Sequence, residues 1–423
     1  MSRLCAVIVA CERAGVTELR HGNSLTAVAS RSARTPLLAV AAFLLLTAPL
    51  TLVVGLSAPH RFSARALTYL TGPAWLDGWI EYDSGWYYRI VTDGYFFIPG
   101  QQSSIAFFPS YPVVVRGVAA LLGDVQVAGM LVTLVAGAGA IGLFAVWAGD
   151  RLSPAATVTA VLLALLYPYA FFVHATMYAD AVFLLTVIGA FVLLERGHPV
   201  LAGLVGICAT AGRPVGVALT VGLVLRLLEI RAAGGTGASA TSVRLRNLPD
   251  AVRRLRPADY GVLLSVLGFA GWCAYLWARF GNPLAFVAAE SAPGWDQGAG
   301  PWTWFKLVFV GTLLRGPPDI ALTLAVQAVL CLGAVLLFPR IRRLFGWGYL
   351  AYVLVAVGIP LIGTKDFMGT GRYLLAAFPV FAAAADLLTS VRHGRVLRAV
   401  VLTLFAAGLV AGTMLYARGY EVS

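Results

Sequence analysis

Long apolar runs recur along almost the whole chain and decide its fold class. A helix crosses the ~30 Å hydrocarbon core of a bilayer with about 20 predominantly apolar residues. Runs of that kind lie at 36–57, 125–148, 153–173, 178–195, 260–279, 318–338, 345–363, 373–389 and 397–416. The apolar stretch 199–229 is long enough for two short crossings, with a break at Gly212, Arg213 and Pro214. The pattern predicts an all-α, polytopic integral membrane protein with about 11 transmembrane helices.

The composition excludes the other broad classes of protein. Of the 423 residues, 60% are hydrophobic and 12% are charged, whereas soluble domains carry about 25% charged residues. A soluble enzyme, a disordered chain and a disulfide scaffold are therefore excluded. The net charge of +12 is typical of cytoplasmic loops that face anionic lipid, so we expect no nucleic-acid partner. The five cysteines show no metal-ligand spacing.

The apolar runs also divide the chain into regions. We expect a single transmembrane domain at 36–416, a cytoplasmic, disordered tail at 1–35 and a second tail at 417–423. The first run is too long for a signal-peptide core, so it should remain as an uncleaved anchor. All basic residues except Lys306 and Lys365 are arginine, a usage typical of GC-rich bacterial genomes. We therefore expect a multi-pass protein of the plasma (inner) membrane of a bacterium.

Arginine is retained on the cytoplasmic side of short loops, and this rule orients the chain. Several arginine clusters can be cytoplasmic together, including the arginine-rich linker 230–257, in which we expect 232–243 to be flexible. The condition is that 58–124 forms a long first outer loop, with 105–122 as an interfacial or re-entrant element. The segments on the outer face are then 58–124, the turns at Tyr178 and Arg213, the loop 280–317 and the loop 364–372. The candidate chemistry therefore gathers on one side of the membrane.

The first outer loop contains an acid among aromatic residues, in the sequence WLDGWIEYDSGWYYRIVTDGYFF at 75–97. If 81–91 is helical, Asp83, Trp86 and Tyr87 share one face, because residues three or four apart are neighbours on a helix. Such an acid can serve as a general base against a hydroxyl group. The alternative is an interfacial aromatic belt with solvated acids. The following AFFPSYP at 106–112 forces the backbone to turn, either as a cavity wall or as a simple entry turn.

Three further residues lie at the outer ends of predicted crossings. Asp180 stands in the first turn of a helix, where it can stabilise the helix dipole or bind substrate. His174 either contacts a phosphate or fills an amphipathic interface. Arg213 interrupts the apolar stretch 199–229, and an arginine there is costly unless it faces a cavity or a partner. Its candidate partners are a phosphate and Asp180, and the alternative is a loop arginine that reaches the interface.

Two outer segments complete the set. The segment 279–298 is amphipathic and offers apolar contacts for a lipid chain. The segment 363–379 places Lys365, Asp366, Arg372 and Tyr373 at the mouth of a helix pair. Two cations near lipid headgroups suit a phosphate ester. The alternative is that each cation anchors the chain at the interface.

Taken in order, these segments resemble the PIG-V type mannosyltransferases, a family of the GT-C superfamily of polyprenyl-phosphate-sugar-dependent integral membrane glycosyltransferases. The family's acid, aromatic and GlyTyr pattern is similar to 83–95, and its AFFP with a second YP is similar to 106–112. Its Tyr-x-acid is similar to Tyr178–Asp180, although Glu is the acid expected there. Its ThrArg turn is similar to 212–216, and its GlyxProLeuAlaPhe stretch is similar to 280–286. Its ArgTyr followed by PhePro is similar to 372–379. The resemblance covers about residues 36–390 in the correct order.

The resemblance implies a GT-C-like fold and a transferase that takes a sugar, mannose first of all, from a polyprenyl monophosphate with inversion. The acceptor would be a lipid or glycan on the extracytoplasmic face, and the other partners would be membrane lipids. The resemblance implies that Asp83 is the catalytic base. It implies that substrate is bound by Asp180, Arg213, Arg372, Tyr373, Lys365, His174, Tyr87 and Tyr178. The chain has no DxD pair, so we expect no cofactor and no metal requirement.

Three alternatives remain open at this stage. The same mechanism could use another polyprenyl-phosphate sugar, such as arabinofuranose. A transporter or flippase for a lipid-linked sugar would spread acids and arginines through the middle of the membrane, whereas here they gather at one face. A non-catalytic scaffold would tolerate replacement of Asp83.

Overall fold

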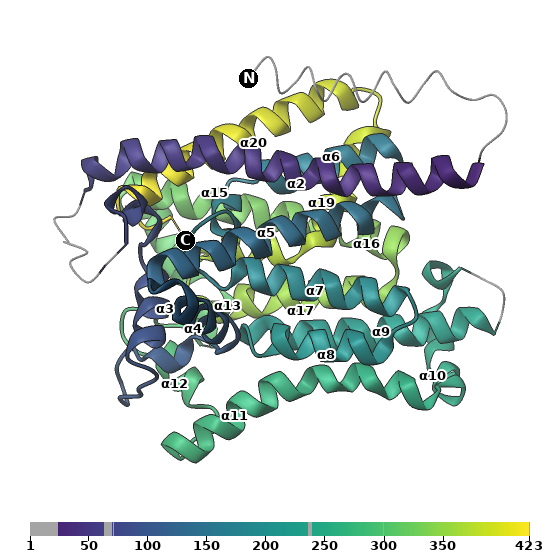
Figure 1. Cartoon of the computed structure of the whole chain (residues 1–423), viewed down its shortest axis with the longest axis horizontal. Helices are drawn as coiled ribbons and strands as arrows, with labels where there is room; N and C mark the ends of the chain where they lie inside the picture. The colour runs from purple at the N-terminus through teal and green to yellow at the C-terminus, as the bar shows by residue number, and fades with distance from the viewer. Residues whose placement is uncertain (1–23, 63–69, 71, 236–238, 299, 423) are drawn as a thin grey trace.

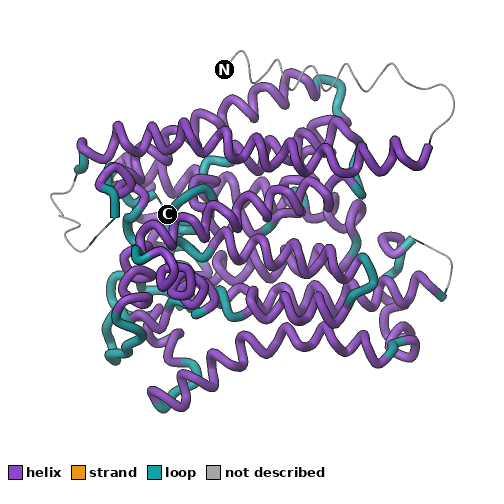
Figure 2. Tube along the Cα trace, viewed as in Figure 1, coloured by secondary structure: helices purple, strands orange, loops and turns teal. Residues whose placement is uncertain are grey.

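The computed structural model describes residues 24–62, 70, 72–235, 239–298 and 300–422. Within these ranges the chain consists of helices, loops and turns, and no strand occurs (Figure 2). The expected tail at 1–35 lies outside the described residues as far as residue 23. From Ser24 onward the chain is helical, so the first helix begins well before the apolar run at 36–57.

The helices follow one another closely along the chain and are joined by short loops and single 3₁₀ turns. In chain order the α-helices are α2 (Ser24–Ser57), α3 (Asp83–Thr92), α4 (Ser110–Leu122), α5 (Val125–Gly149), α6 (Pro154–Leu166), α7 (Asp180–Glu195), α8 (Pro199–Thr210), α9 (Val217–Gly234), α10 (Leu248–Ala251), α11 (Val266–Phe280), α12 (Ala285–Glu290), α13 (Pro301–Trp304), α14 (Leu307–Arg315), α15 (Pro318–Leu336), α16 (Phe338–Phe345), α17 (Trp347–Gly363), α18 (Thr370–Tyr373), α19 (Phe378–Ser390) and α20 (Gly394–Ala417).

The longer helices lie side by side in one bundle (Figure 1). Helix α5 packs against α2 and α7, α7 packs against α8, and α9 packs against α17. The interior between them is filled by large aromatic side chains, including Phe144, Trp147, Phe191, Tyr349 and Phe378. Aromatic side chains bury a large apolar area each, so this central layer is the main packing core of the bundle.

Among the described residues, five helical segments are long and apolar enough to cross a membrane: Arg34–His60, Val125–Gly149, Pro257–Phe280, Pro318–Leu336 and Gly394–Ala417. The helices Thr370–Ala376 and Phe378–Ser390 meet at a bend of 84° and together form either a broken span or a re-entrant loop. Of the most apolar part of Gly394–Ala417, only 17% of the residues are buried. Large exposed apolar surfaces are rare on soluble monomers. The chain is therefore an all-α, multi-pass membrane protein.

Helices form in most of the predicted apolar runs, but one of them ends earlier than predicted. The break at Gly212–Pro214 is present, with α8 ending at Thr210 and α9 beginning at Val217. The run 153–173 was predicted as one crossing, and this prediction was wrong in extent, because α6 ends at Leu166. Pro168 follows at once, and a proline disfavours helical backbone in the residue before it. The chain then turns through 167–179 before α7 begins.

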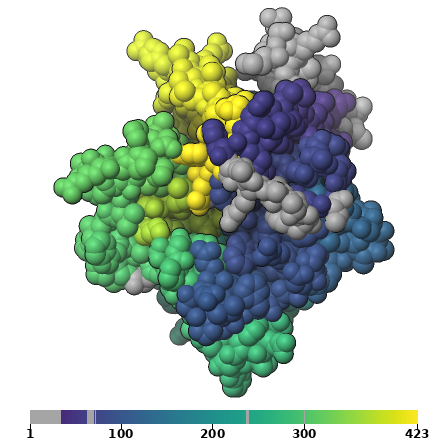
Figure 3. Space-filling view, turned by 90° about the vertical axis from the view of Figure 1, so that its left-hand side faces the viewer, coloured from purple at the N-terminus to yellow at the C-terminus, as the bar shows by residue number. Residues whose placement is uncertain are grey.

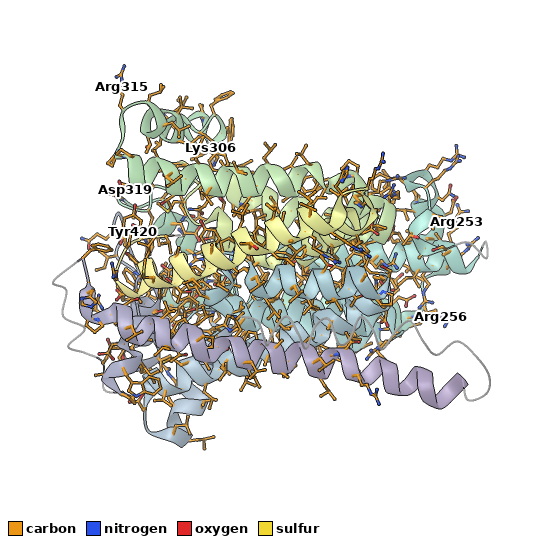
Figure 4. All side chains as sticks on the ribbon, turned by 90° about the horizontal axis from the view of Figure 1, so that it is seen from above. Arg253, Arg256, Lys306, Arg315, Asp319 and Tyr420 are labelled. Carbon is orange, nitrogen blue, oxygen red and sulfur yellow. The ribbon has the colours of Figure 1, made fainter. Side chains whose placement is uncertain are left out.

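Two sets of loops lie at opposite ends of the bundle. The short helices α3, α4, α12 and α13 gather at the end that is on the left in Figure 1, and α10 lies at the other. Figure 4 places Lys306, Asp319 and Tyr420 at the first end and Arg253 and Arg256 at the second. We call these the α3 end and the arginine-rich end. The predicted segregation of the loops is thus present along the long axis of the bundle.

The linker expected at 230–257 is folded where the structure describes it. After α9, the residues from Ala240 onward form short helical turns, among them α10. Val243, Leu248 and Ala251 are buried against Ala232 and Ala233 of α9 in a small apolar cluster. The glycine- and threonine-rich first half of the linker gave no sign of this packing, because the apolar side chains that pack against α9 come later in the sequence.

Candidate active site

Asp83 is the first residue of α3, and its backbone is fixed from two sides. The residue before it, Tyr82, has a φ of 50°, which is uncommon for a non-glycine residue, and its hydroxyl donates to the carbonyl of Gly419 at 2.5 Å. The N–H of Asp83 donates to the hydroxyl of Tyr178 at 3.1 Å. The carboxylate of Asp83 thus stands in the first turn of α3, where the helix dipole favours a negative charge.

The other end of α3 is held by an arginine from α4. Arg116 donates from Nη2 to the carbonyl of Ile90 at 2.7 Å and from Nε to the carbonyl of Val91 at 3.1 Å. The last carbonyls of a helix lack intrahelical partners, and a basic side chain can satisfy them. Arg116 in the interfacial element therefore holds α3, and with it Asp83, in a fixed orientation.

Asp83 forms an ion pair with Arg372 of α18. Nη1 of Arg372 donates to Oδ2 of Asp83 at 2.7 Å, and the side chain of Asp83 is 27% exposed while that of Arg372 is 8% exposed. Nε of Arg372 is buried and has no hydrogen-bond partner among the described residues. Unsatisfied buried donors are rare in native proteins. Arg372 therefore has the capacity to bind a further anionic oxygen.

The turn that carries Arg372 and the loop before it are held by hydrogen bonds from three other segments of the chain. The hydroxyl of Tyr167 donates to the carbonyl of Gly371 at 2.9 Å, and the N–H of Gly371 donates to Oε1 of Gln327 at 3.0 Å. Lys306 donates from Nζ to the carbonyl of Thr364 at 2.5 Å and to its hydroxyl at 3.0 Å. Helix α18 is therefore tied to α15 and to the chain just after α6, and the loop before α18 is tied to the chain just before α14.

A second ion pair joins Asp180, at the start of α7, to Arg213, in the break between α8 and α9. Their side chains are 4% and 9% exposed, so both are buried. An isolated buried charge would be costly, and each of these two charges is balanced by the other. Of the two candidate partners of Arg213, a phosphate and Asp180, the structure places Asp180 in contact with it.

Aromatic rings connect the two ion pairs. The guanidinium carbon of Arg213 lies 4.6 Å from the centre of the Tyr373 ring, and that of Arg372 lies 5.4 Å from the same ring and 5.0 Å from the ring of Tyr178. Tyr87, buried on α3, packs against Tyr178 with the ring centres 6.3 Å apart. Cations are attracted to aromatic faces at such distances. The fold therefore brings together four separate segments of the chain, which carry Asp83, Tyr87, Tyr178, Asp180, Arg213, Arg372 and Tyr373.

The predicted turn at 106–112 lies beside this group. The N–H of Ser110, the first residue of α4, donates to the carbonyl of Ala211 at 2.9 Å, next to Arg213. The ring of Phe107 lies 5.2 Å from the ring of Tyr87. This turn therefore contacts both the break that carries Arg213 and the helix that carries Asp83.

Two predicted site residues have other partners. Lys365 pairs with Asp296 at 2.7 Å, and both side chains are well exposed. His174 is fully buried against α2, where its Nδ1 lies 2.7 Å from the hydroxyl of Thr47 and its ring stacks on Phe43 at 4.2 Å. Lys365 therefore links two outer segments, and His174 packs the bundle. The structure does not place either one in contact with the two arginines.

Two acids that the sequence analysis did not select lie beside the site. Burial raises the pKa of Glu290, the last residue of α12, to about 7, although the charge of Arg213 lowers it. Burial also raises the pKa of Glu421, and the charges of Asp83 and Asp366 raise it further. The signal for Glu290 was present in the sequence as the only acid of the apolar segment at 283–294, but nothing local indicated that α12 folds toward Arg213.

The chain after α20 crosses the α3 end next to the site. The carbonyl of Arg418 accepts from the N–H of Phe62 at 2.9 Å, and the hydroxyl of Tyr420 donates to Oδ2 of Asp319 at 2.8 Å. In Figure 3, which faces this end, the yellow C-terminal segment enters between the blue first loop and the green segments after residue 300. Glu421, in the same segment, interacts electrostatically with Asp83 and Arg372.

No group of three or more His, Cys, Asp or Glu side chains in the described ranges is placed to hold a metal ion. The charged groups of the site are instead two carboxylate–guanidinium pairs with aromatic neighbours. Guanidinium groups bind phosphate oxygens with directed hydrogen bonds. The arrangement is suited to an anionic phosphate on the arginines and to a neutral hydroxyl group near Asp83.

Comparisons with known proteins give no family assignment by sequence. No family model matches the chain, and no curated protein matches it. Among solved structures, it is similar to ArnT from Cupriavidus metallidurans bound to undecaprenyl phosphate, with 15% identity, a TM-score of 0.47, and coverage of 90% of this chain and 77% of ArnT. It is similar to the oligosaccharyltransferase of Archaeoglobus fulgidus, with 15% identity, a TM-score of 0.46 and coverage of 90% of this chain. The chain spans 56% of the length of that oligosaccharyltransferase.

Proposed function

We propose that the chain is a membrane glycosyltransferase that moves a sugar from a polyprenyl monophosphate to a hydroxyl group of a lipid or glycan. The observation that carries this proposal is the pairing of Asp83 with Arg372 beside the pairing of Asp180 with Arg213, at the end of the bundle opposite the arginine-rich loops. The resemblance to the PIG-V type family supports mannose as the sugar and inversion at the anomeric carbon. The membrane would be the inner membrane of a bacterium, with the site on its extracytoplasmic face.

The reaction makes two demands that these residues can meet. The acceptor oxygen forms a bond to the anomeric carbon, the bond from that carbon to the phosphate oxygen breaks, and its electron pair stays with the polyprenyl phosphate. The acceptor proton must be taken up, and Asp83 is the acid placed at a partly exposed position to take it. Charge that builds on the phosphate must be balanced, and Arg372 and Arg213 supply fixed positive charge.

The ion pair itself couples donor binding to the base. A donor phosphate needs the same guanidinium that Asp83 holds, so phosphate binding to Arg372 weakens the hydrogen bond from Arg372 to Asp83. In this proposal the donor phosphate leaves the carboxylate of Asp83 free to accept a hydrogen bond from the acceptor hydroxyl. Asp180 holds Arg213 in place, and Tyr87, Tyr178 and Tyr373 line the site.

The test of the proposal is Asp83→Asn. Membranes that contain the full chain are supplied with labelled polyprenyl-phosphomannose, and loss of label from the donor and its appearance in extracted lipids and glycans are measured. A positioned base contributes about 10²- to 10⁴-fold, so we expect the variant to lose at least that factor while it is still inserted. The matched control is Asp93→Asn, which changes an exposed acid at the other end of α3.

Transfer by Asp83→Asn at the unmodified rate would refute the base assignment. The same assay tests metal independence, which is part of the proposal, because a chelator of divalent cations should leave the rate unchanged. Replacing the labelled donor with polyprenyl-phosphoarabinofuranose distinguishes between the two sugars. A flippase would move the lipid-linked label across the membrane without releasing polyprenyl phosphate.

A further inference from the structure

Three aromatic side chains from separate segments meet next to the site. We define the aromatic platform as Trp86 of α3, Phe107 of the turn before α4, and Trp295 after α12. The ring centres of Trp86 and Phe107 are 5.7 Å apart in a stacked arrangement, and Trp295 lies 5.4 Å from Trp86 and 5.7 Å from Phe107. The three rings therefore all pack against one another.

The platform differs from the packing core behind it. The adjacent cluster, which includes Phe108, Trp272 and Phe286, is buried and already supplies the apolar contacts that hold α12 and the first loop together. Each ring of the platform keeps part of its surface exposed. Ligand sites combine such apolar surfaces with a few well-placed polar groups.

The platform is tied to the site on both sides. Trp86 follows Asp83 by three residues on α3, so their side chains are neighbours on one face of that helix. Asp296, the residue after Trp295, pairs with Lys365 at 2.7 Å, and the N–H of Gly298 donates to the carbonyl of Gly363 at 2.8 Å. The segment that carries Trp295 is therefore anchored to the loop that leads to Arg372.

Glu290 belongs to the same segment of the chain as Trp295. It ends α12, five residues before Trp295, and its carboxylate interacts with the charge of Arg213. Within the described ranges that carboxylate has no hydrogen-bond partner in the protein. A carboxylate oxygen is a strong acceptor of hydrogen bonds from hydroxyl groups.

We propose that the aromatic platform and Glu290 form the acceptor subsite, and that it binds a carbohydrate ring. The inference rests on the proposed function and names the acceptor class, a glycan rather than a simple lipid alcohol. The C–H groups on one face of a pyranose or furanose ring pack against aromatic faces, which carry negative charge density. The hydroxyl groups at the ring edge donate to Glu290. This placement puts the acceptor beside Asp83, while the donor phosphate takes Arg372 and Arg213.

The test uses saturation-transfer difference NMR with the purified full chain in detergent micelles. The probes are the methyl glycosides of mannopyranose, glucopyranose, galactopyranose and arabinofuranose. When aromatic protons of the protein are irradiated, we expect saturation on the ring C–H protons of at least one glycoside. Trp295→Ala should lose most of that signal, and Trp295→Phe should keep most of it. Trp302→Ala is the matched control, because Trp302 is 68% exposed on the nearby helix α13.

Three results would overturn the proposal. The first is that no glycoside shows saturation, and the second is that Trp302→Ala loses as much of the glycoside signal as Trp295→Ala. The third is that the chain protons of farnesyl phosphate show saturation and that Trp295→Ala loses this saturation. The last result would assign the platform to an isoprenoid chain. Failure of the proposed function is a separate outcome. If Asp83→Asn transfers sugar at the unmodified rate while Trp295→Ala loses glycoside binding, the carbohydrate subsite stands and the base assignment falls.

Discussion

At the residue scale, the central feature is that each site arginine has its own carboxylate. Asp83 holds Arg372, and Asp180 holds Arg213. Breaking a buried ion pair by removing one partner is costly, since it leaves an uncompensated charge. The two pairs nevertheless differ, because Asp83 is partly exposed and Asp180 is not. Asp83 can therefore exchange its partner, whereas Asp180 is suited to a positioning role.

Arg372→Ala should weaken the use of the donor more than the use of the acceptor. Hydrogen bonds to charged groups contribute about 1.5–3 kcal/mol, so we expect the KM for the polyprenyl-phosphate sugar to rise by about 10- to 100-fold. Arg372→Lys keeps the charge and should recover part of the loss. Initial rates at varied donor concentration measure the effect, with Arg315→Ala, an exposed arginine at the end of α14, as the control. An unchanged KM for the donor would limit Arg372 to anchoring α18.

Glu290→Gln should change how stability depends on pH. The pKa of Glu290 is raised from 4.5 to about 7 by burial, against the opposing charge of Arg213. Between these two values the folded protein binds a proton that the unfolded chain releases, so the contribution of Glu290 to stability falls as the pH rises through 7. Glutamine cannot ionise. The apparent Tm of the variant relative to the unmodified protein should therefore be higher at pH 8 than at pH 5.

The apparent Tm is measured in detergent micelles by following unfolding of the full chain at both pH values. If the difference in apparent Tm between the variant and the unmodified protein is the same at pH 5 and pH 8, Glu290 ionises at its ordinary pKa and is not buried.

At the scale of elements, breaks in helices position the site more than helices do. Arg213 lies between α8 and α9, Tyr178 lies between α6 and α7, and Arg372 lies in the one-turn helix before the 84° bend into α19. Backbone that is not helical is tolerated at membrane depth only where protein or water satisfies it. Each break here is held by hydrogen bonds from neighbouring segments, and each places a polar side chain toward the same end.

The sequence predicted some of these breaks for local reasons and missed others. The break at Arg213 was predictable, because a charged residue and a proline interrupt an apolar run. The end of α6 at Leu166 was missed although Pro168 marks it, because Tyr169, Phe171 and Phe172 continue the apolar composition after the helix has stopped. The meeting of Glu290 with Arg213 was also out of reach, since it depends on how α12 folds back over the bundle.

Gly371→Ala tests the placement of Arg372 by α18. A Cβ at this position would lie 2.6 Å from Cζ of Tyr169, and the Tyr169 ring is part of the buried core. Overpacking of this kind costs about 1–3 kcal/mol. We expect a lower apparent Tm and a lower rate of sugar transfer, because the turn that carries Arg372 must shift. Gly363→Ala is the control, since a Cβ there meets no atom within 4 Å. Equal rates in the two variants would contradict this role for the turn.

At the scale of the whole molecule, the bundle separates two kinds of chemistry along its long axis. The α3 end holds the ion-paired site and the aromatic platform, and the arginine-rich end holds Arg253 and Arg256. The general plan of apolar crossings with polar loops at two ends follows from hydropathy and charge alone, which is why the sequence predicted it. The folded form of the linker after α9 depends on packing between segments, and the sequence did not predict it.

Cysteine labelling tests which end faces outward. Ser291, after α12, and Ser242, in the segment after α9, are both exposed, and each is replaced by cysteine in a chain whose five native cysteines have been removed. Because arginine-rich loops stay in the cytoplasm, an impermeant thiol reagent should label position 291 in intact cells. Position 242 should react only after the membrane is permeabilised. The reverse pattern would place the site in the cytoplasm and contradict an extracytoplasmic reaction.

The pairing of Asp83 with Arg372 has a consequence for the end of a catalytic cycle. A spent lipid phosphate and a fresh donor present similar oxygens to the same guanidinium, so neither can be held more tightly than the internal carboxylate permits. The carboxylate of Asp83 can displace the lipid phosphate product from Arg372. This competition limits product inhibition, and it also lowers the affinity for the incoming donor lipid.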